Sequence, residues 1–167
     1  MTTFAVLASG PSMNLETADY LRGKCGVIAV SNTFTLAPWA DALVSHDMKW
    51  WKAYPKAFKF SGRKFCRFQI GVEEFSPQGL PSCCNSGLMG MYVAEHIFKA
   101  SRILMLGFDM HGTHFFGKHK EPLKNTTDKR RQFFLKQFSM WNAREVINCT
   151  PGSAVSNFRR GNIKDFI

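Results

Sequence analysis

Short apolar runs recur along this chain, separated by longer stretches in which polar and apolar residues mix. Each run has the length of a β-strand and is apolar along most of that length. Such runs are typical of strands buried on both faces, as in a parallel sheet. They predict six strands, at residues 4–8, 26–30, 42–45, 64–67, 102–107 and 145–149.

The stretches between these runs predict helices at residues 13–22, 48–58, 86–99 and 128–142. In the third helix, Ser86 suits the N-cap position and Lys99 brings positive charge to the last turn. In the fourth, apolar side chains recur at the spacing of one buried helix face. Strands that alternate with helices predict an α/β protein with a mostly parallel, twisted sheet of about six strands and helices on both faces.

The composition suits a single domain over residues 1–167, because 45% of the residues are hydrophobic and 14% aromatic. Residues 1–11 contain no basic segment and only a short apolar run. We therefore expect a cytoplasmic protein with no signal peptide and no membrane span. The five cysteines lack a Cys-x-x-Cys spacing, which predicts reduced thiols rather than disulfides or a zinc site.

The chain is basic, with 22 lysines and arginines against 12 acidic residues and a formal net charge of +10. Basic runs lie at residues 49–64, 118–136 and 159–164. This charge favours an anionic partner such as a nucleotide, a nucleic acid or an acidic glycan. No helix-turn-helix or RNA-recognition pattern accompanies it, and many such runs are ordinary solvated faces.

Small or hydrogen-bonding residues follow nearly every predicted strand. Ligands of an open α/β sheet bind outside the carboxyl ends of its strands, so these residues are expected at one edge. Each set alone is also typical of a turn or a helix cap. Together they predict a nucleotide site made of Ser9, Gly10, Pro11, Ser12, Asn32, His46, Asp47, Asn85, Ser86, Gly87, Thr150, Gly152 and Ser153.

Residues 9–12 come directly after the first predicted strand and before the first helix. Free backbone amides and the positive end of a helix dipole attract phosphate there, and Gly10 permits a close approach. The segment matches neither a Walker A motif nor a G-x-G-x-x-G motif. We expect a nucleotide, bound in neither of those two geometries.

Three of the five histidines, His111, His114 and His119, follow the strand at 102–107 in one glycine-broken loop with Asp109. A histidine cluster suits proton transfer, phosphate contact or metal binding. The spacing of these residues matches no established zinc pattern, so we expect no metal. A general base is favoured, with His119 or His114 accepting a proton from an acceptor hydroxyl.

Several short motifs, in order over nearly the whole chain, resemble the bacterial sialyltransferases of glycosyltransferase family 42. They are also similar to small relatives encoded by bacteriophages and prophages and, more distantly, to the archaeal hydroxymethylpterin pyrophosphokinases. The motifs are Ala-Ser-Gly-Pro-Ser12, Val-Ser-Asn32, Asn-Ser-Gly87, Leu-Gly-Phe-Asp109, His-Phe-Phe-Gly-Lys-His119 and Asn-Cys-Thr-Pro-Gly-Ser153.

The resemblance implies a Rossmann-like domain that binds a CMP-sugar without a metal, and a lid at about residues 109–127 that carries the catalytic histidine. By that resemblance Gly10 to Ser12 flank the nucleotide, Asn32 meets it or its phosphate, and Ser86-Gly87 border the sugar or the base. Residues 150–153 then hold the base and ribose. His119 is the preferred base, since the family's His-x-x-Gly-His pattern has one extra residue here.

The sequence also departs from the family. Cys83 stands where the sialyltransferases have an arginine, His46 and Ser9 stand where they have asparagines, and Met110 and Phe115 lie where lid tyrosines are expected. These departures argue against sialic acid as the donor.

These patterns, together with what the resemblance implies, lead to three candidate functions. The first is a metal-independent transferase that passes a group from a nucleotide-activated donor, such as a nucleotide sugar, to the hydroxyl of a glycan or nucleic acid. The second is a phosphoryl or pyrophosphoryl transferase that needs Mg²⁺ bound through Asp47 or Asp109. The third is a non-catalytic nucleotide- or DNA-binding accessory protein of a phage, in a bacterial host cell. A homo-oligomer is compatible with each.

Overall fold

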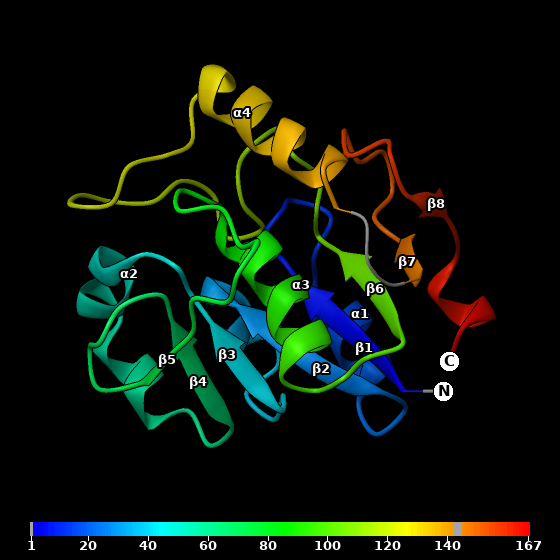
Figure 1. The fold of residues 1–167 in the computed structure, drawn as a ribbon, viewed down its shortest axis with the longest axis horizontal. Helices are drawn as coiled ribbons and strands as arrows, with labels where there is room; N and C mark the ends of the chain where they lie inside the picture. The colour runs from blue at the N-terminus through cyan, green and yellow to red at the C-terminus, as the bar shows by residue number, and fades with distance from the viewer. Residues whose placement is uncertain (1, 142–144) are drawn as a thin grey trace.

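A single all-parallel sheet runs through the molecule, with strand order β5-β4-β3-β2-β1-β6-β7-β8 (Figure 1). The computed structural model describes residues 2–141 and 145–167. The strands are β1 (Thr3–Leu7), β2 (Gly26–Val30), β3 (Ala42–Val44), β4 (Arg63–Cys66), β5 (Glu73–Glu74), β6 (Arg102–Leu106), β7 (Glu145–Asn148) and β8 (Arg159–Arg160).

Four α-helices and three 3₁₀ helices connect the strands. The α-helices are α1 (Leu15–Leu21), α2 (Met48–Ala53), α3 (Ser86–His96) and α4 (Asp128–Ser139). The 3₁₀ helices are η1 (Ser31–Thr35), η2 (Pro55–Lys59) and η3 (Ile163–Asp165).

Alternate residues of each central strand enter two separate cores, because successive side chains of a strand point to opposite faces. Phe4 and Val6 of β1 pack in one core with buried side chains of α3 and with Phe138 of α4. Ala5 and Leu7 pack in the other with Leu21 of α1 and with the tryptophans of α2. The sheet is therefore covered on both faces, which confirms the predicted Rossmann-like α/β fold.

The strand count differs from the prediction, since the sheet has eight strands rather than about six. The two additional strands lie at its two edges and have only two residues each, Glu73–Glu74 and Arg159–Arg160. All four side chains are charged and exposed, so these strands lack the apolar run that marks the others. Backbone pairing with β4 and β7 alone defines them.

The predicted helix over 48–58 is divided in two. α2 ends at Ala53, and Pro55 begins the separate 3₁₀ turn η2. Proline lacks an N–H and restricts the residue before it, which explains the break at Tyr54. The predicted end of the last helix at residue 142 lies outside the described residues.

The order in which strands are added to the sheet reverses at β1. Strands β1 to β5 follow one another towards one edge, whereas β6, β7 and β8 continue from the other side of β1. The carboxyl ends of β1 and β6 therefore form the switch point at which open α/β sheets bind ligands. The segment 109–127 leaves β6 at this point and extends towards the side of the molecule where α2 lies (Figure 1). No helix among the described residues is both long and apolar enough to cross a membrane.

Candidate functional site: a crevice at the strand ends and a histidine lid

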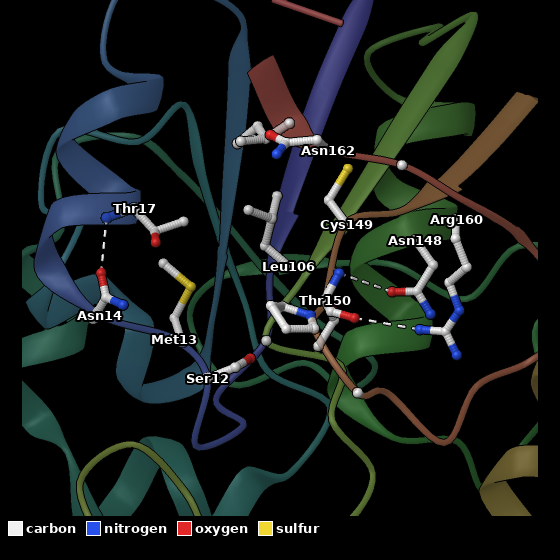
Figure 2. A pocket seen from close by; sticks show the side chains of 15 residues that line it. Ser12, Met13, Asn14, Thr17, Leu106, Asn148, Cys149, Thr150, Arg160 and Asn162 are labelled. Carbon is white, nitrogen blue, oxygen red and sulfur yellow. Dashed lines mark hydrogen bonds between the residues drawn. The ribbon is translucent and has the colours of Figure 1, made fainter. Parts of the chain in front are cut away.

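A cavity of about 670 Å³ opens at the switch point, beside the carboxyl ends of β6 and β7 (Figure 2). On one side it is bordered by α1 and the residues before it, and on the other by the segment that follows β7. Its polar lining residues are Ser12, Asn14, Thr17, Asn148, Thr150, Arg160 and Asn162. Of the predicted nucleotide-binding residues, the cavity brings together Ser12, Thr150 and Gly152.

The segment after β7 is held by buried hydroxyl groups. Thr150 Oγ1 accepts the Phe108 N–H at 3.0 Å, and the Ser153 hydroxyl donates to the Phe108 carbonyl. The Arg160 guanidinium donates to the Thr150 carbonyl at 3.3 Å and the Ser153 carbonyl at 2.6 Å. Ser153 is thus part of the scaffold, while Thr150, the exposed Gly152 and Arg160 border the crevice.

The loop over residues 9–12 uses its polar groups within the protein. Gly10 N–H donates to the Gly107 carbonyl at 2.9 Å, and Pro11 has no N–H to offer. Ser12 donates its N–H to Asp109 Oδ1 at 3.2 Å and its hydroxyl to Oδ2 at 2.8 Å. The amides of Gly10 and Ser12, expected to bind phosphate, are therefore occupied, and α1 begins only at Leu15.

Asp109 explains the glycine at position 10. A Cβ atom built on Gly10 would lie 1.9 Å from Asp109 Oδ2 and 2.3 Å from the Gly107 carbonyl oxygen. The absence of a side chain at Gly10 thus lets the Asp109 carboxylate lie against the backbone of this loop. Asp109 itself is 2% exposed and joins the ends of β1 and β6.

The residues after β2 and β3 have structural partners as well. Asn32 is buried and accepts the Trp50 indole N–H at 2.7 Å. Asp47 is the N-cap of α2, where its side chain accepts the Lys49 N–H. His46 donates its backbone N–H to Ser86 Oγ at 2.9 Å, which ties the end of β3 to the start of α3.

α3 begins with the predicted Asn-Ser-Gly segment. Asn85, and not the predicted Ser86, is the N-cap, and its side chain accepts the Leu88 N–H at 2.7 Å, because Ser86 is already the first helical residue. The predicted end of the helix at Lys99 is also wrong, since α3 ends at His96. Gly87 packs so close to Phe108 that an added Cβ would lie 2.8 Å from the ring. Gly87 therefore serves the packing of α3 against the segment after β6.

The segment 109–119 crosses the sheet edge and is anchored along its path. His111 Nε2 lies 3.1 Å from the Gly152 carbonyl oxygen, beside the crevice. Phe115 N–H donates to the Ser9 carbonyl at 3.0 Å. Asn125 accepts the His119 N–H at 2.8 Å, which closes the far part of the loop. One segment thus runs from the crevice to the histidine pair.

His114 and His119 form a pair within this lid, with ring centroids 4.6 Å apart and the ring of Phe116 against both. Burial lowers the pKa of each imidazole, and the nearby His114 lowers the pKa of His119 further, while the charge of Asp47 opposes this. His119 Nδ1 is buried and has no hydrogen-bond partner. The pair is therefore neutral near pH 7 and has an unused acceptor or donor site.

The carboxylates named for a Mg²⁺ site have other partners. Both oxygens of Asp109 accept hydrogen bonds from Ser12, and one oxygen of Asp47 caps α2. Within residues 2–141 and 145–167, no three His, Cys, Asp or Glu side chains are grouped so as to hold a metal ion.

Comparisons of this chain with protein-family models, with curated proteins and with solved structures give no match.

Arg160 and Asn162 also line the crevice, although no sequence pattern predicted them. Both follow β7 in a charged, glycine-containing segment that has no apolar periodicity. Their position is decided by the pairing of β8 with β7, for which the sequence carries no local signal.

Proposed function

We propose that this protein is a metal-independent transferase that passes a group from a nucleotide-activated donor to an acceptor hydroxyl. The nucleotide occupies the crevice between Ser12 and Thr150, where polar side chains and the exposed backbone at Gly152 line a cavity of about 670 Å³. This volume falls within the range typical of small-ligand sites. The motif resemblance to glycosyltransferase family 42 supports a nucleotide sugar, with a CMP-sugar as the first candidate.

The observation that carries the proposal is the buried and unpartnered Nδ1 of His119. A buried polar atom without a partner is unfavourable, by about 1–3 kcal/mol. A movement of the lid that uncovers Nδ1 would let a ligand hydroxyl become its partner. Burial also lowers the pKa of this imidazole, which keeps the ring neutral and able to accept a proton.

The reaction then balances without a metal. The acceptor hydroxyl gives its proton to His119, its oxygen forms a bond to the activated carbon of the donor, and the bond from that carbon to the phosphate oxygen breaks. The nucleotide leaves with the electron pair. The basic surface of the chain, at net charge +10, favours the approach of an anionic donor.

The span between the two regions fits an extended donor. The histidine pair is on the side of Asp47, which follows β3, and the crevice is beside β6 and β7. β3 and β6 are separated by three strand spacings, or about 14 Å at about 4.8 Å per spacing. The lid contacts both regions, so it is suited to cover a donor that bridges them.

Nucleotide binding is tested by thermal unfolding against CMP, UDP, GDP, ATP and their sugar conjugates, with EDTA or with Mg²⁺. A nucleotide that binds the folded state raises the melting temperature. We expect one base to be favoured and the shift to persist in EDTA. A flat response across the panel contradicts the proposal, and a shift that requires Mg²⁺ favours phosphoryl transfer instead.

The base is tested with His119→Ala, assayed for release of free nucleotide from the donor selected by that panel. We expect turnover to fall by about 10²- to 10⁴-fold while the nucleotide-induced melting shift remains. His96→Ala makes the same chemical change on α3, on an exposed side chain that stacks on Tyr92, and should leave turnover unchanged. Equal losses in binding and turnover would remove His119 from the role of base.

A further inference from the structure

The segment 81–83, which precedes α3, is contacted by polar side chains from two neighbouring strands. Arg67 follows β4 and donates a guanidinium N–H to the Pro81 carbonyl at 2.9 Å. His46 follows β3, and its Nε2 lies 3.3 Å from the Ser82 carbonyl oxygen. The ends of β3 and β4 are thus brought to the start of α3.

A second guanidinium reaches the same segment from α4. Arg130 directs an N–H to Cys83 Sγ at 3.7 Å, and its guanidinium carbon lies 5.3 Å from the centre of the Phe134 ring. Gln137, two turns further along α4, donates to the Cys83 carbonyl at 2.6 Å. These contacts hold α4 against residue 83 and fix the direction from which Arg130 arrives.

Arg67, His46 and Arg130 contact three consecutive residues, and the charges of both arginines act on the His46 imidazole. Burial lowers the pKa of His46, and the charges of Arg67 and Arg130 act in the same direction. Asp47 is the acidic group that opposes them. Two positive charges and one negative charge therefore act on the His46 imidazole, and the contact with the Ser82 carbonyl also raises its pKa.

Neither guanidinium is neutralised by an acidic side chain in the described part of the chain. Ion pairs are instead made by other arginines: Arg63 with Glu73, Arg102 and Arg159 with Glu145, and Arg131 with Asp128. A guanidinium has five N–H donors. The hydrogen bonds described above use one donor of Arg67 and one donor of Arg130. Donors of the kind that recognise carboxylate and phosphate thus remain at both.

We propose that Arg67 and Arg130 form an oxyanion subsite that binds a phosphate or carboxylate group of the substrate next to His46. This inference rests on the proposed transferase function for its place in the reaction. The subsite adjoins Asp47, whose charge also acts on His119, so it lies at the end of the sheet edge where the group is transferred. The transferred group or the acceptor is accordingly acidic.

The subsite is tested by titrating the ¹⁵N-labelled protein with inorganic phosphate, with sodium chloride at matched ionic strength as the reference. We expect the amide signals of Ser86 and Gly87 and the guanidinium signals of Arg67 and Arg130 to shift with phosphate and to remain in place with chloride. Equal shifts with both salts would reduce the effect to ionic strength and overturn the proposal.

Variants assign the effect to the two side chains. Arg67→Gln and Arg130→Gln should each weaken phosphate binding about tenfold or more, as expected for the loss of a charged hydrogen bond. Arg159→Gln removes one positive charge at the opposite edge of the sheet and should leave the affinity nearly unchanged. Arg130 is exposed, so R130Q reports on the subsite even where the loss of the Arg67 contact affects folding. An affinity unchanged in R130Q, or reduced equally in R159Q, would overturn the proposal.

Repeating the titration with a saturating nucleotide conjugate distinguishes two sources of the oxyanion. A donor that carries the acidic group competes with phosphate, whereas an acidic acceptor leaves phosphate binding intact. The phosphate titration requires neither nucleotide binding nor turnover. A failure of the subsite is therefore separate from a failure of the transferase proposal.

Discussion

At the scale of single residues, several polar side chains at the strand ends act first as internal hydrogen-bond partners. Asp109 binds Ser12, Asn32 binds Trp50, and Ser153 binds the Phe108 carbonyl. Buried polar groups require partners, so these side chains order the loops that border the crevice. Three buried side-chain atoms of the described residues have no partner, namely His119 Nδ1, Gln137 Oε1 and Trp141 Nε1. Of these three groups the imidazole of His119 is the one that can take up a proton near neutral pH.

The substitution Gly10→Ala should prevent the loop at residues 9–12 from closing on Asp109. Its Cβ would overlap the carboxylate and the Gly107 carbonyl, so we expect the free energy of unfolding to fall by more than about 3 kcal/mol. Urea denaturation followed by circular dichroism measures this change.

Gly23→Ala is the matched control for this substitution. Gly23 has φ +75° and no atom within 4 Å of an added Cβ. The substitution should therefore lower the free energy of unfolding by only about 1–2 kcal/mol, through backbone strain. Equal losses in the two variants would contradict the role of the Asp109 contact.

At the scale of elements, the lid is a loop whose position over the sheet edge depends on where it is anchored. Phe115 holds it at the end of β1, and Arg131 of α4 donates to the Gly112 carbonyl while it pairs with Asp128. These anchors bring the histidine pair over the sheet edge. Leu123 packs in the core, whereas most residues between 118 and 127 are exposed, which makes local opening easier than global unfolding.

The substitution Arg131→Ala should loosen the lid and leave the core unchanged. We expect tryptic cleavage after Lys118 and Lys120 to accelerate several-fold, while the free energy of unfolding changes by less than about 1 kcal/mol. Lys129→Ala, on the same helix and exposed, removes a similar charge and a similar trypsin site. The two variants should differ in the cleavage rate of the lid; identical rates would exclude Arg131 as an anchor.

His114 and His119 should titrate below the ordinary histidine value of 6.5, because burial lowers the pKa of both imidazoles. ¹H–¹⁵N NMR titration of His119 measures its midpoint. His114→Asn removes a neighbouring charge and should move that midpoint upward. A midpoint at or above 6.5 in the parent protein would contradict the neutral base.

The same shifts make stability depend on pH. His46, His114 and His119 all have lowered pKa values, so the unfolded chain binds protons more tightly than the folded one. The free energy of unfolding should therefore decrease as the pH falls below about 6.5, where unfolded histidines begin to bind protons.

At the scale of the whole molecule, the sheet ends in two short charged strands. β5 consists of two glutamates, of which Glu73 accepts a hydrogen bond from Arg63 at 2.9 Å. β8 consists of two arginines, of which Arg159 pairs with Glu145. Charged side chains on short edge strands discourage the pairing of one sheet with another.

The double substitution Glu73→Val and Glu74→Val should remove this protection at the β5 edge. An apolar edge strand with unpaired backbone groups promotes association, so we expect concentration-dependent oligomers in sedimentation velocity experiments. Glu16→Val, at an exposed position in the first turn of α1, is the control and should leave sedimentation unchanged. A double variant that sediments as the parent protein does would contradict the argument.

The sequence by itself determined the six central strands, the helical character of the segments between them and the position of the histidine loop after β6. It did not determine that the helix at 48–58 is divided at Tyr54. These features are local, because an apolar run reports the burial of its own residues. The cap of α3 lies one residue earlier than predicted, at Asn85 instead of Ser86. The predicted strand at 26–30 agrees with β2, and the others agree within one residue at each end.

Tertiary structure alone decided which polar groups remain available to a ligand. Ser12 and Asp109 are 97 positions apart in the sequence, and Arg130 and Cys83 are 47 apart, so no local sequence pattern predicts either contact. The edge strands likewise exist only through pairing with their neighbours. Hydrogen-bond partners depend on which residues the fold brings together. The fold therefore occupies the amides of the expected phosphate loop, and it brings two arginines to the start of α3.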